Sequence, residues 1–276
     1  MKVREAIAAG AARLAEGSDT PRLDAELLMA RALGLTREEL LLSDQSFPTP
    51  PRFEQLVERR AAGEPVAYIV GRRAFWTIDL AVAPGVLIPR PDTETLIEAA
   101  LDHFGDRVPK RILDLGTGSG ALLLAALDQW PGAQGLGIDA SQAALDIAGA
   151  NAHRLGLEKR ASFRLGDWAE GLDQRFDLIL CNPPYVEDGA DLPRDIFEWE
   201  PREALFAGPD GLDAYRELAP QVGRLIATGG LACVEIGATQ EIGAEALFAA
   251  QGLHVGCRHD LGDRPRCLLL RQPDGN

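Results

Sequence analysis

Short apolar runs alternate with helical segments from residue 111 onward, and this alternation restricts the fold more than any other feature. Seven runs are typical of β-strands: 111–115, 134–139, 162–165, 176–181, 231–236, 255–259 and 266–270. Helices are expected between most of them, at 121–129, 142–155, 212–225 and 241–251. Strands separated by helices form a parallel sheet with right-handed crossovers. The loop 260–265 is too short for a crossover, so the last two strands should pair antiparallel.

The N-terminal part of the chain has a different pattern. Short amphipathic helices are expected over residues 1–74, one of them opened by a capping box of Thr36 and Glu39. Residues 75–90 predict a β-hairpin linker that turns at Pro84-Gly85. Residues 91–276 then form the α/β domain.

The negative charge is concentrated in the α/β part. Residues 1–90 carry 12 Lys and Arg against 12 Asp and Glu, whereas residues 91–276 carry 16 against 30, which is the whole net charge of −14. A domain this acidic repels a phosphate backbone. We therefore expect no direct nucleic-acid partner and favour a basic protein as partner.

The cysteines and histidines predict neither a metal site nor a disulfide framework. Cys181, Cys233, Cys257 and Cys267 form no C-x-x-C pair, and the four histidines lie apart from them. Free thiols suit a reducing cytoplasm, where we expect the protein. No segment approaches the roughly 18 consecutive apolar residues of a membrane span, and the N-terminus does not resemble a signal peptide.

A glycine-rich turn follows the first strand of the α/β domain. Gly116, Thr117, Gly118, Ser119 and Gly120 lead into the next helix, and glycines let the backbone approach a ligand closely. Asp139 ends the following strand, where a carboxylate can accept hydrogen bonds from both hydroxyls of a ribose. The turn predicts a nucleoside-containing cofactor.

The same turn leaves the identity of that cofactor open. Gly116, Gly118 and Ala121 also satisfy the looser dinucleotide pattern G-x-G-x-x-[GA], so a nicotinamide cofactor is an alternative. Asp114 before the turn, and three alternating glycines, favour a cofactor with a charged amino-acid tail. Trp168 follows the third strand and either packs beside the cofactor base or belongs to the core.

The chemistry is expected at Asn182-Pro183-Pro184-Tyr185, directly after the apolar strand 176–181. An amide or aromatic amino nitrogen is a poor nucleophile because its lone pair is delocalised. The Asn182 side-chain oxygen and the Pro183 backbone carbonyl could each accept one N–H, more favourably as charge develops in the transition state. The prolines fix the backbone, and Tyr185 offers a flat face to a planar substrate. The turn therefore indicates methylation of a planar nitrogen, with adenine and a carboxamide both open.

These motifs together resemble the release-factor glutamine methyltransferases, the HemK/PrmC family, over nearly the whole chain. The segments that carry the resemblance are 63–71 followed by Phe75-Trp76, 86–94, 114–120, 182–185, 200–212 and 260–266. The stretch 86–94, Val-Leu-Ile-Pro-Arg-Pro-Asp-Thr-Glu, is the most recognisable of them.

The resemblance implies a Rossmann-like class I methyltransferase domain behind a helical substrate-recognition domain. It implies S-adenosyl-L-methionine as the cofactor, S-adenosyl-L-homocysteine as its product, and the glutamine of a Gly-Gly-Gln loop in class 1 peptide chain release factors as the substrate. The carried-over cofactor residues are Gly116, Thr117, Gly118, Ser119, Gly120, Asp139, Trp168 and Asn182. The catalytic residues are Asn182, Pro183 and Tyr185, and the substrate contacts are Asn182, Pro183, Pro184 and Tyr185.

Three other functions stay open at this point. A DNA adenine-N6 methyltransferase shares the Asn-Pro-Pro-Tyr motif, but the acidic domain supplies no basic groove. A nicotinamide-dependent dehydrogenase is an alternative on the dinucleotide pattern. An adaptor that binds a release factor without catalysis would not need Asn182.

Overall fold

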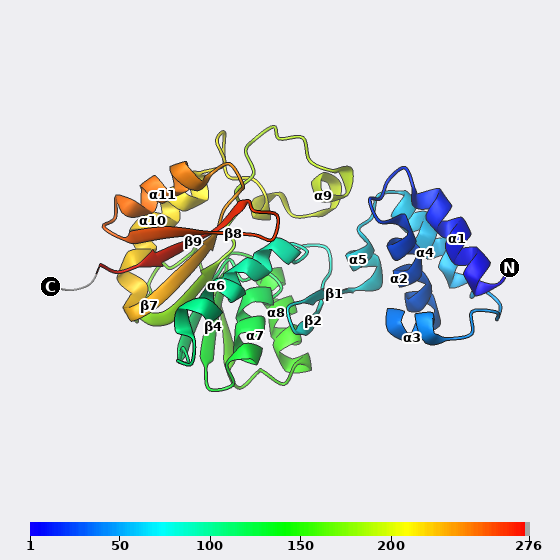
Figure 1. Cartoon of the computed structure of the whole chain (residues 1–276), viewed down its shortest axis with the longest axis horizontal. Helices are drawn as coiled ribbons and strands as arrows, with labels where there is room; N and C mark the ends of the chain where they lie inside the picture. The colour runs from blue at the N-terminus through cyan, green and yellow to red at the C-terminus, as the bar shows by residue number, and fades with distance from the viewer. Residues whose placement is uncertain (274–276) are drawn as a thin grey trace. The chain divides into compact units, whose positions relative to one another are not determined.

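The computed structural model describes residues 1–273, which fold into two compact units (Figure 1). One unit comprises residues 1–72 together with 192–199, and the other comprises 73–191 together with the chain from residue 200 onward. No helix among the described residues is long and apolar enough to cross a membrane.

The first unit is a small helical bundle. Its helices are α1 (Val3–Leu14), α2 (Pro21–Leu33), α3 (Arg37–Leu42), α4 (Arg52–Ala61), α5 (Val66–Val70) and the distant α9 (Arg194–Trp199). The predicted capping box of Thr36 and Glu39 is present at the start of α3. Buried Arg60 joins α2 to α9, because its guanidinium lies 2.8 Å from Asp24 and 3.3 Å from Asp195. This ion pair explains why a segment so far along the chain belongs to the bundle.

The second unit is an α/β domain with a seven-stranded sheet, as predicted. The strands are β3 (Arg111–Leu115), β4 (Gln134–Asp139), β5 (Ala161–Leu165), β6 (Phe176–Cys181), β7 (Ile226–Glu235), β8 (His254–His259) and β9 (Pro265–Arg271), in the spatial order β5-β4-β3-β6-β7-β9-β8. The strands from β3 to β7 pair in parallel. The expected antiparallel pairing of the last two strands is confirmed, and β9 is also antiparallel to β7.

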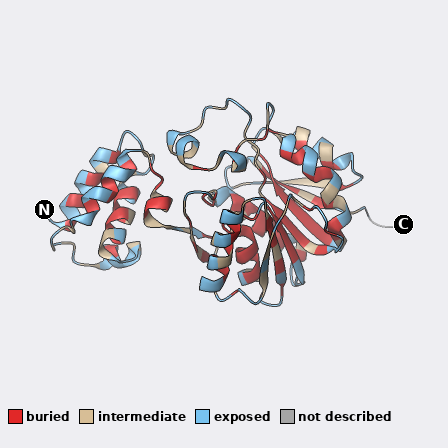
Figure 2. Cartoon of the chain, turned by 180° about the vertical axis from the view of Figure 1, so that it is seen from behind, coloured by how far each residue is buried: buried red, intermediate tan, exposed pale blue. Residues whose placement is uncertain are grey.

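Helices cover both faces of the sheet because neighbouring strand residues point to opposite sides. Ile112 packs in one core with α6 (Glu94–Phe104) and α7 (Ala121–Gln129), while Leu113 packs in the other with α10 (Asp213–Leu225) and α11 (Glu241–Ala249) (Figure 1). Figure 2 shows the buried residues concentrated along these strands. Helix α8 (Gln142–Arg154) follows β4.

The predicted turn of the linker hairpin was wrong. The two-stranded sheet is formed by β1 (Arg72–Phe75) and β2 (Ile78–Ala81), which are joined at Trp76-Thr77. Residues 86–90, directly after Pro84-Gly85, do not form a strand. Buried Asn151 binds both backbone groups of Ala81, the last residue of β2: its amide oxygen accepts from Ala81 N–H at 2.7 Å, and its nitrogen donates to the Ala81 carbonyl at 3.0 Å. A side chain therefore replaces the strand partner that the pattern predicted.

Asp114 in β3 stabilises the turn that leads to α7. Its carboxyl is buried, and Oδ2 accepts from the Thr117 hydroxyl at 2.6 Å and from Leu123 N–H at 3.2 Å. Oδ1 has no hydrogen-bond partner in the described part of the chain. Burial raises the pKa of Asp114 to about 7, although both hydrogen bonds oppose the shift.

Substituting Asp114 tests this burial. The folded-state pKa of about 7 lies above the value of about 3.9 expected in the unfolded chain. The contribution of this group to stability is therefore fully present below the unfolded pKa and is lost as pH rises through the folded one. We expect the free energy of unfolding to fall between about pH 5 and about pH 8, and Asp114→Asn to reduce that fall. Urea denaturation at constant ionic strength measures the free energy of unfolding at each pH. The exposed Asp106→Asn serves as the control. If Asp114→Asn shows as large a fall with pH as this control, the pKa of Asp114 is not raised by burial.

Two glycine-to-alanine substitutions should have opposite effects. Gly149 lies within α8 with open space around an added Cβ, so Gly149→Ala should raise the free energy of unfolding by ~0.5–1 kcal/mol. An added Cβ at Gly230 would lie 2.8 Å from the Asp177 carbonyl oxygen and 3.0 Å from that of Ala227, so Gly230→Ala should lower it by ~1–3 kcal/mol. Urea denaturation again measures the free energy of unfolding. If Gly230→Ala does not lower it, the backbone around Gly230 can shift to make room for the added methyl group.

Candidate active site

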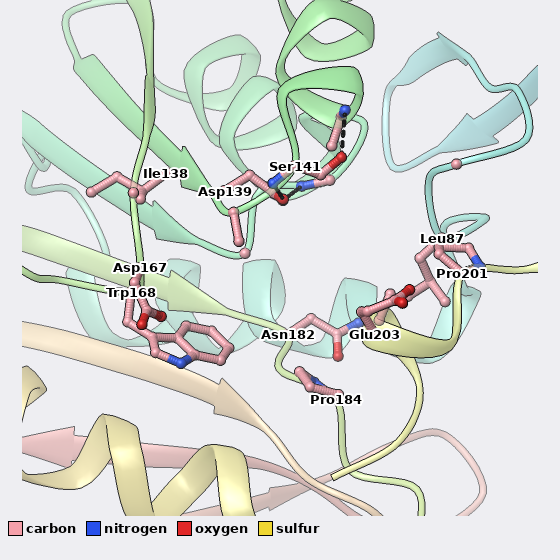
Figure 3. Close-up of a pocket in the computed structure, with 17 residues that line it drawn as sticks. Leu87, Ile138, Asp139, Ser141, Asp167, Trp168, Asn182, Pro184, Pro201 and Glu203 are labelled. Atoms are coloured by element: carbon pink, nitrogen blue, oxygen red, sulfur yellow. Dashed lines mark hydrogen bonds between the residues drawn. The ribbon is translucent and has the colours of Figure 1, made fainter.

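A cavity of about 410 Å³ lies where four strands of the sheet end (Figure 3). Residues that follow β3, β4, β5 and β6 all contribute to its lining. Of the predicted site residues, those that line it are Gly116, Gly118, Asp139, Trp168, Asn182 and Pro184. The carboxyl ends of parallel strands thus bring together residues that are separated by up to 68 positions in the sequence.

The glycine-rich turn presents its backbone to the cavity. Gly116 and Gly118 have positive φ angles of 70° and 55°, which glycine adopts without strain. The other predicted members of the turn lie behind it: Thr117 and Ser119 are buried, and an added Cβ at Gly120 would lie 2.9 Å from Leu124 Cδ1. These three residues shape the turn and do not line the cavity.

Asp139 is held rigidly at the end of β4. Its Oδ2 accepts from Gly118 N–H at 2.8 Å, and its Oδ1 accepts from Ser141 N–H at 2.9 Å. A carboxylate oxygen has a second lone pair, so both oxygens can accept further hydrogen bonds from a ligand in the cavity. Two backbone N–H groups therefore orient the carboxylate, and each of its oxygens can still accept another hydrogen bond.

Trp168 both lines the cavity and packs against the sheet core. Its backbone has a φ of 45°, an uncommon conformation for a bulky residue. The indole nitrogen donates to Glu217 on α10 at 2.9 Å, which fixes the ring plane. An added Cβ at Gly116 would lie 3.6 Å from the Trp168 ring, an ordinary contact distance, so the turn and the indole are close neighbours and it is the positive φ of Gly116 that favours glycine there.

Asn182 projects from the end of β6 between Trp168 and the wall that contains Leu87 (Figure 3). Its Nδ2 donates to the Thr93 hydroxyl at 3.1 Å. One of its two N–H groups is therefore used by the protein, and Oδ1 is the atom that can accept a hydrogen bond from a ligand.

The other residues of the Asn182–Tyr185 turn do not all face this cavity. Pro183 is buried, and the Tyr185 side chain points away and lines a second cavity of about 340 Å³. The Tyr185 hydroxyl donates to Glu235 Oε1 at 3.1 Å. Burial, and then the charge of Glu235, raise the pKa of Tyr185 above its usual range. Its phenol is therefore held neutral.

The wall opposite the glycine turn depends on buried Glu200. Its Oε2 accepts from Ile88 N–H at 3.0 Å, and its Oε1 lies 2.5 Å from the Arg90 guanidinium. This clamp joins the 86–94 stretch to the 200–205 segment, and Leu87 and Pro201 on either side of it line the cavity. The predicted site residues included none from either segment, although the family resemblance had singled out both.

The predicted site residues also omitted the small lining residues Gly85, Ala140, Ser141, Ala144, Gly166 and Ala204, as well as the apolar Ile138. Ser141 carried a usable signal, because it caps α8 by accepting from Ala144 N–H. Glu203 was missed as well, and with Asp139 and Asp167 it makes three acids in a lining that contains no Lys or Arg.

One group of side chains within residues 1–273 has the spacing of metal ligands. Ligand atoms of Glu241, Cys257 and His259 lie within 4.8 Å of one another. His259 Nδ1 is 2.9 Å from Asp263, and none of the three lines the cavity described above. The group is therefore separate from the candidate active site.

Two family models match the chain. The PrmC N-terminal domain model matches residues 5–71, and the methyltransferase small domain model matches residues 92–200. Two solved structures share the fold of the second unit. The ribosomal protein L11 methylase of Lactobacillus delbrueckii has a TM-score of 0.51 at 19% identity and covers 67% of this chain and 81% of its own. The 16S rRNA N2 G1207 methyltransferase of T. thermophilus has a TM-score of 0.53 at 19% identity, covering 73% and 50%.

Curated relatives match over most of their length. A release factor glutamine methyltransferase of Rhodospirillum rubrum is 46% identical over 93% of this chain and 80% of its own. The protein of the same name from Moorella thermoacetica is 41% identical over 98% of both chains. With both family models and relatives this similar, the chain belongs to the release factor glutamine methyltransferase family.

Proposed function

We propose that this protein transfers a methyl group from S-adenosyl-L-methionine to the side-chain amide nitrogen of the glutamine in the Gly-Gly-Gln loop of class 1 release factors. The observation that carries the proposal is the state of Asn182. Its nitrogen is bound to Thr93 at the cavity, so its oxygen is the group available to a substrate N–H. The names of the curated relatives identify the substrate as a release factor glutamine.

The cavity suits S-adenosylmethionine in size and in charge. A volume of about 410 Å³ lies within the range of about 300–1,000 Å³ of ligand pockets. The cofactor carries a positive sulfonium and an ammonium group, which the acidic side chains Asp139, Asp167 and Glu203 attract. The pyrophosphate of a nicotinamide dinucleotide would be repelled by the same acids, which disfavours a dehydrogenase.

The residues of the cavity match the parts of the cofactor. Asp139 would accept from the ribose hydroxyls, while Trp168 and Asp167 would contact the adenine. The backbone at Gly116 and Gly118 would lie beside the amino-acid tail, with Thr117, Ser119 and Gly120 holding the turn in shape. The cofactor supplies the activated methyl group and leaves as S-adenosyl-L-homocysteine.

The Asn182 turn would present the amide nitrogen. Asn182 Oδ1 and the Pro183 backbone carbonyl each accept one N–H of the substrate, so that its lone pair faces the methyl group. Positive charge would develop on the substrate nitrogen as it accepts the methyl group, and both hydrogen bonds would then strengthen. The nitrogen then loses a proton to water. Positioning supplies most of the rate, and no strong base is needed.

The charge of the α/β domain favours a protein partner over a nucleic acid. The 16 basic and 30 acidic residues of 91–276 disfavour DNA, which a DNA adenine methyltransferase would have to bind. The helical bundle provides a second surface for the release factor. Such a substrate places the protein in the cytoplasm. An adaptor without catalysis would need neither the cofactor cavity nor Asn182.

Methyl transfer tests the substrate directly. We expect label from S-adenosylmethionine on purified release factor, and none on a release factor whose loop glutamine is replaced or on duplex DNA. The readout is radiolabel on the protein band, with a peptide mass 14 Da higher by mass spectrometry confirming the site. Label on DNA, or label that survives the glutamine replacement, would refute the proposed substrate.

Asn182→Ala should separate catalysis from cofactor binding. Because its hydrogen bond strengthens in the transition state, kcat should fall by roughly 10²- to 10³-fold. Cofactor Kd, measured by calorimetry, should change by less than about tenfold. The exposed Gln142→Ala serves as the control. Equal losses in kcat and cofactor affinity would make Asn182 only a cofactor ligand.

A further inference from the structure

The two prolines of the Asn182–Tyr185 turn have no N–H group, so neither can donate a hydrogen bond that would hold the turn in shape. The sheet fixes the residue before the turn, because Cys181 pairs with strands β3 and β7. The end of the turn has left the sheet. It is held by contacts from outside: Val186 pairs with the 205–207 segment, and a side chain binds the Tyr185 carbonyl.

That side chain is Gln240, which stands at the start of α11. Its Nε2 donates to the Tyr185 carbonyl at 2.8 Å and to the Gly211 carbonyl at 3.1 Å. Its Oε1 accepts from Gly237 N–H at 3.0 Å. Both N–H groups of the amide and its oxygen are thus bonded to the backbone. One side chain joins three segments: the turn, the loop before α10 and the residues directly after β7.

The surrounding backbone determines how the Gln240 amide is oriented. If the amide were turned over, Oε1 would face two carbonyl oxygens, which cannot donate, and Nε2 would face the Gly237 N–H, which cannot accept. The backbone of Gln240 is fixed as well. Its N–H donates to the Gly237 carbonyl at 3.0 Å, and its carbonyl accepts from Ala244 N–H at 2.9 Å. The position of the amide is therefore set before it meets the turn.

Two glycines make room for this contact. Gly211 has a φ of 68°, and an added Cβ there would overlap the Tyr185 carbonyl oxygen and lie 2.5 Å from Gln240 Nε2. An added Cβ at Gly237 would lie 2.7 Å from Gln240 Oε1. No side chain fits at either position without displacing the glutamine. Positions 211, 237 and 240 therefore form one arrangement around the Tyr185 carbonyl.

We propose that Gln240 is a positioning residue for methyl transfer, which keeps the Asn182–Tyr185 turn in its active shape by holding the Tyr185 carbonyl. This inference rests on the proposed function of the turn. The Pro183 carbonyl, the second proposed acceptor for the substrate amide, lies between the fixed Cys181 and the held Tyr185. Gln240 and its three partners do not line the cavity of about 410 Å³, so they act on the methyl acceptor and not on the cofactor.

Variants of Gln240 test this role in the full-length enzyme. Gln240→Met removes the amide at nearly constant length, and kcat on release factor should fall by roughly 10- to 100-fold with the KM for S-adenosylmethionine little changed. Gln240→Glu keeps the shape of the side chain but, when ionised, places an acceptor against two carbonyl oxygens. It should therefore lose at least as much.

Gly230→Ala is the control for general destabilisation. Its added Cβ meets the Phe176 and Asp177 carbonyls, at the end of β6 opposite the turn, so it should destabilise the same unit and leave kcat unchanged below its unfolding temperature. An unchanged kcat in Gln240→Met, or a KM for the cofactor that rises as much as kcat falls, would overturn the proposal. So would an equal loss of kcat in Gly230→Ala.

The hydrogen bond to the Tyr185 carbonyl can also be measured without any substrate. Tyrosine occurs at positions 68, 185 and 215, and only Tyr185 is followed by valine. Protein labelled with ¹³C at the tyrosine carbonyls and with ¹⁵N at valine therefore gives a single correlation, from Tyr185 to Val186. The chemical shift of a carbonyl carbon depends on the hydrogen bonds to its oxygen. Gln240→Met and Gln240→Glu should both move this signal, and Gly230→Ala should not.

The two readouts distinguish failure of the inference from failure of the proposed function. A wild-type enzyme that does not methylate release factor would refute the proposed substrate, and the carbonyl signal would still test the contact made by Gln240. A Tyr185 signal unmoved in both Gln240 variants would refute that contact whatever the substrate. A signal that moves while kcat on release factor stays unchanged would refute the positioning role alone.

Discussion

The parallel direction of β3, β4, β5 and β6 is the constraint on which the rest of the structure depends. Because these strands run the same way, the four loops that leave them meet at one edge of the sheet. Each loop brings a different capability: a close backbone approach at Gly116, a carboxylate at Asp139, a ring at Trp168 and an amide at Asn182. The strand ends supply one side of the cavity, and the segments around Leu87 and Pro201 supply the opposite wall.

Three buried acids hold these loops in place. Asp114 fixes the turn after β3, Glu200 clamps the wall at Ile88, and Glu235 accepts a hydrogen bond from the Tyr185 hydroxyl. A carboxylate can accept several hydrogen bonds at once, so one buried acid can fix two segments distant in sequence. The fully buried carboxylates thus lie outside the cavity. Inside it, Asp139 is partly exposed and the Asn182 Oδ1 can accept a hydrogen bond.

The sequence predicted the sheet well because its signals are local. Apolar runs and glycine turns located all seven strands of the sheet, and the position of Asn182 after β6 led to the cavity that it lines. The linker hairpin was misplaced because its end is set by Asn151, which lies 70 residues from its backbone partner at Ala81. Thr93 and Glu235 were missed for the same reason. Thr93 bonds to Asn182 across 89 residues and Glu235 bonds to Tyr185 across 50, and no local sequence pattern predicts such contacts.

The position of β9 inside the sheet has a consequence for the order in which the sheet can assemble. This strand follows the other six in the sequence, yet it lies between β7 and β8 and carries Arg266, which pairs with Asp92 beside Thr93. Until β9 pairs, β7 has an open edge and Asp92 lacks its ion pair with Arg266. The parallel strands that surround the cavity can therefore pair with one another before the antiparallel edge of the same sheet is complete.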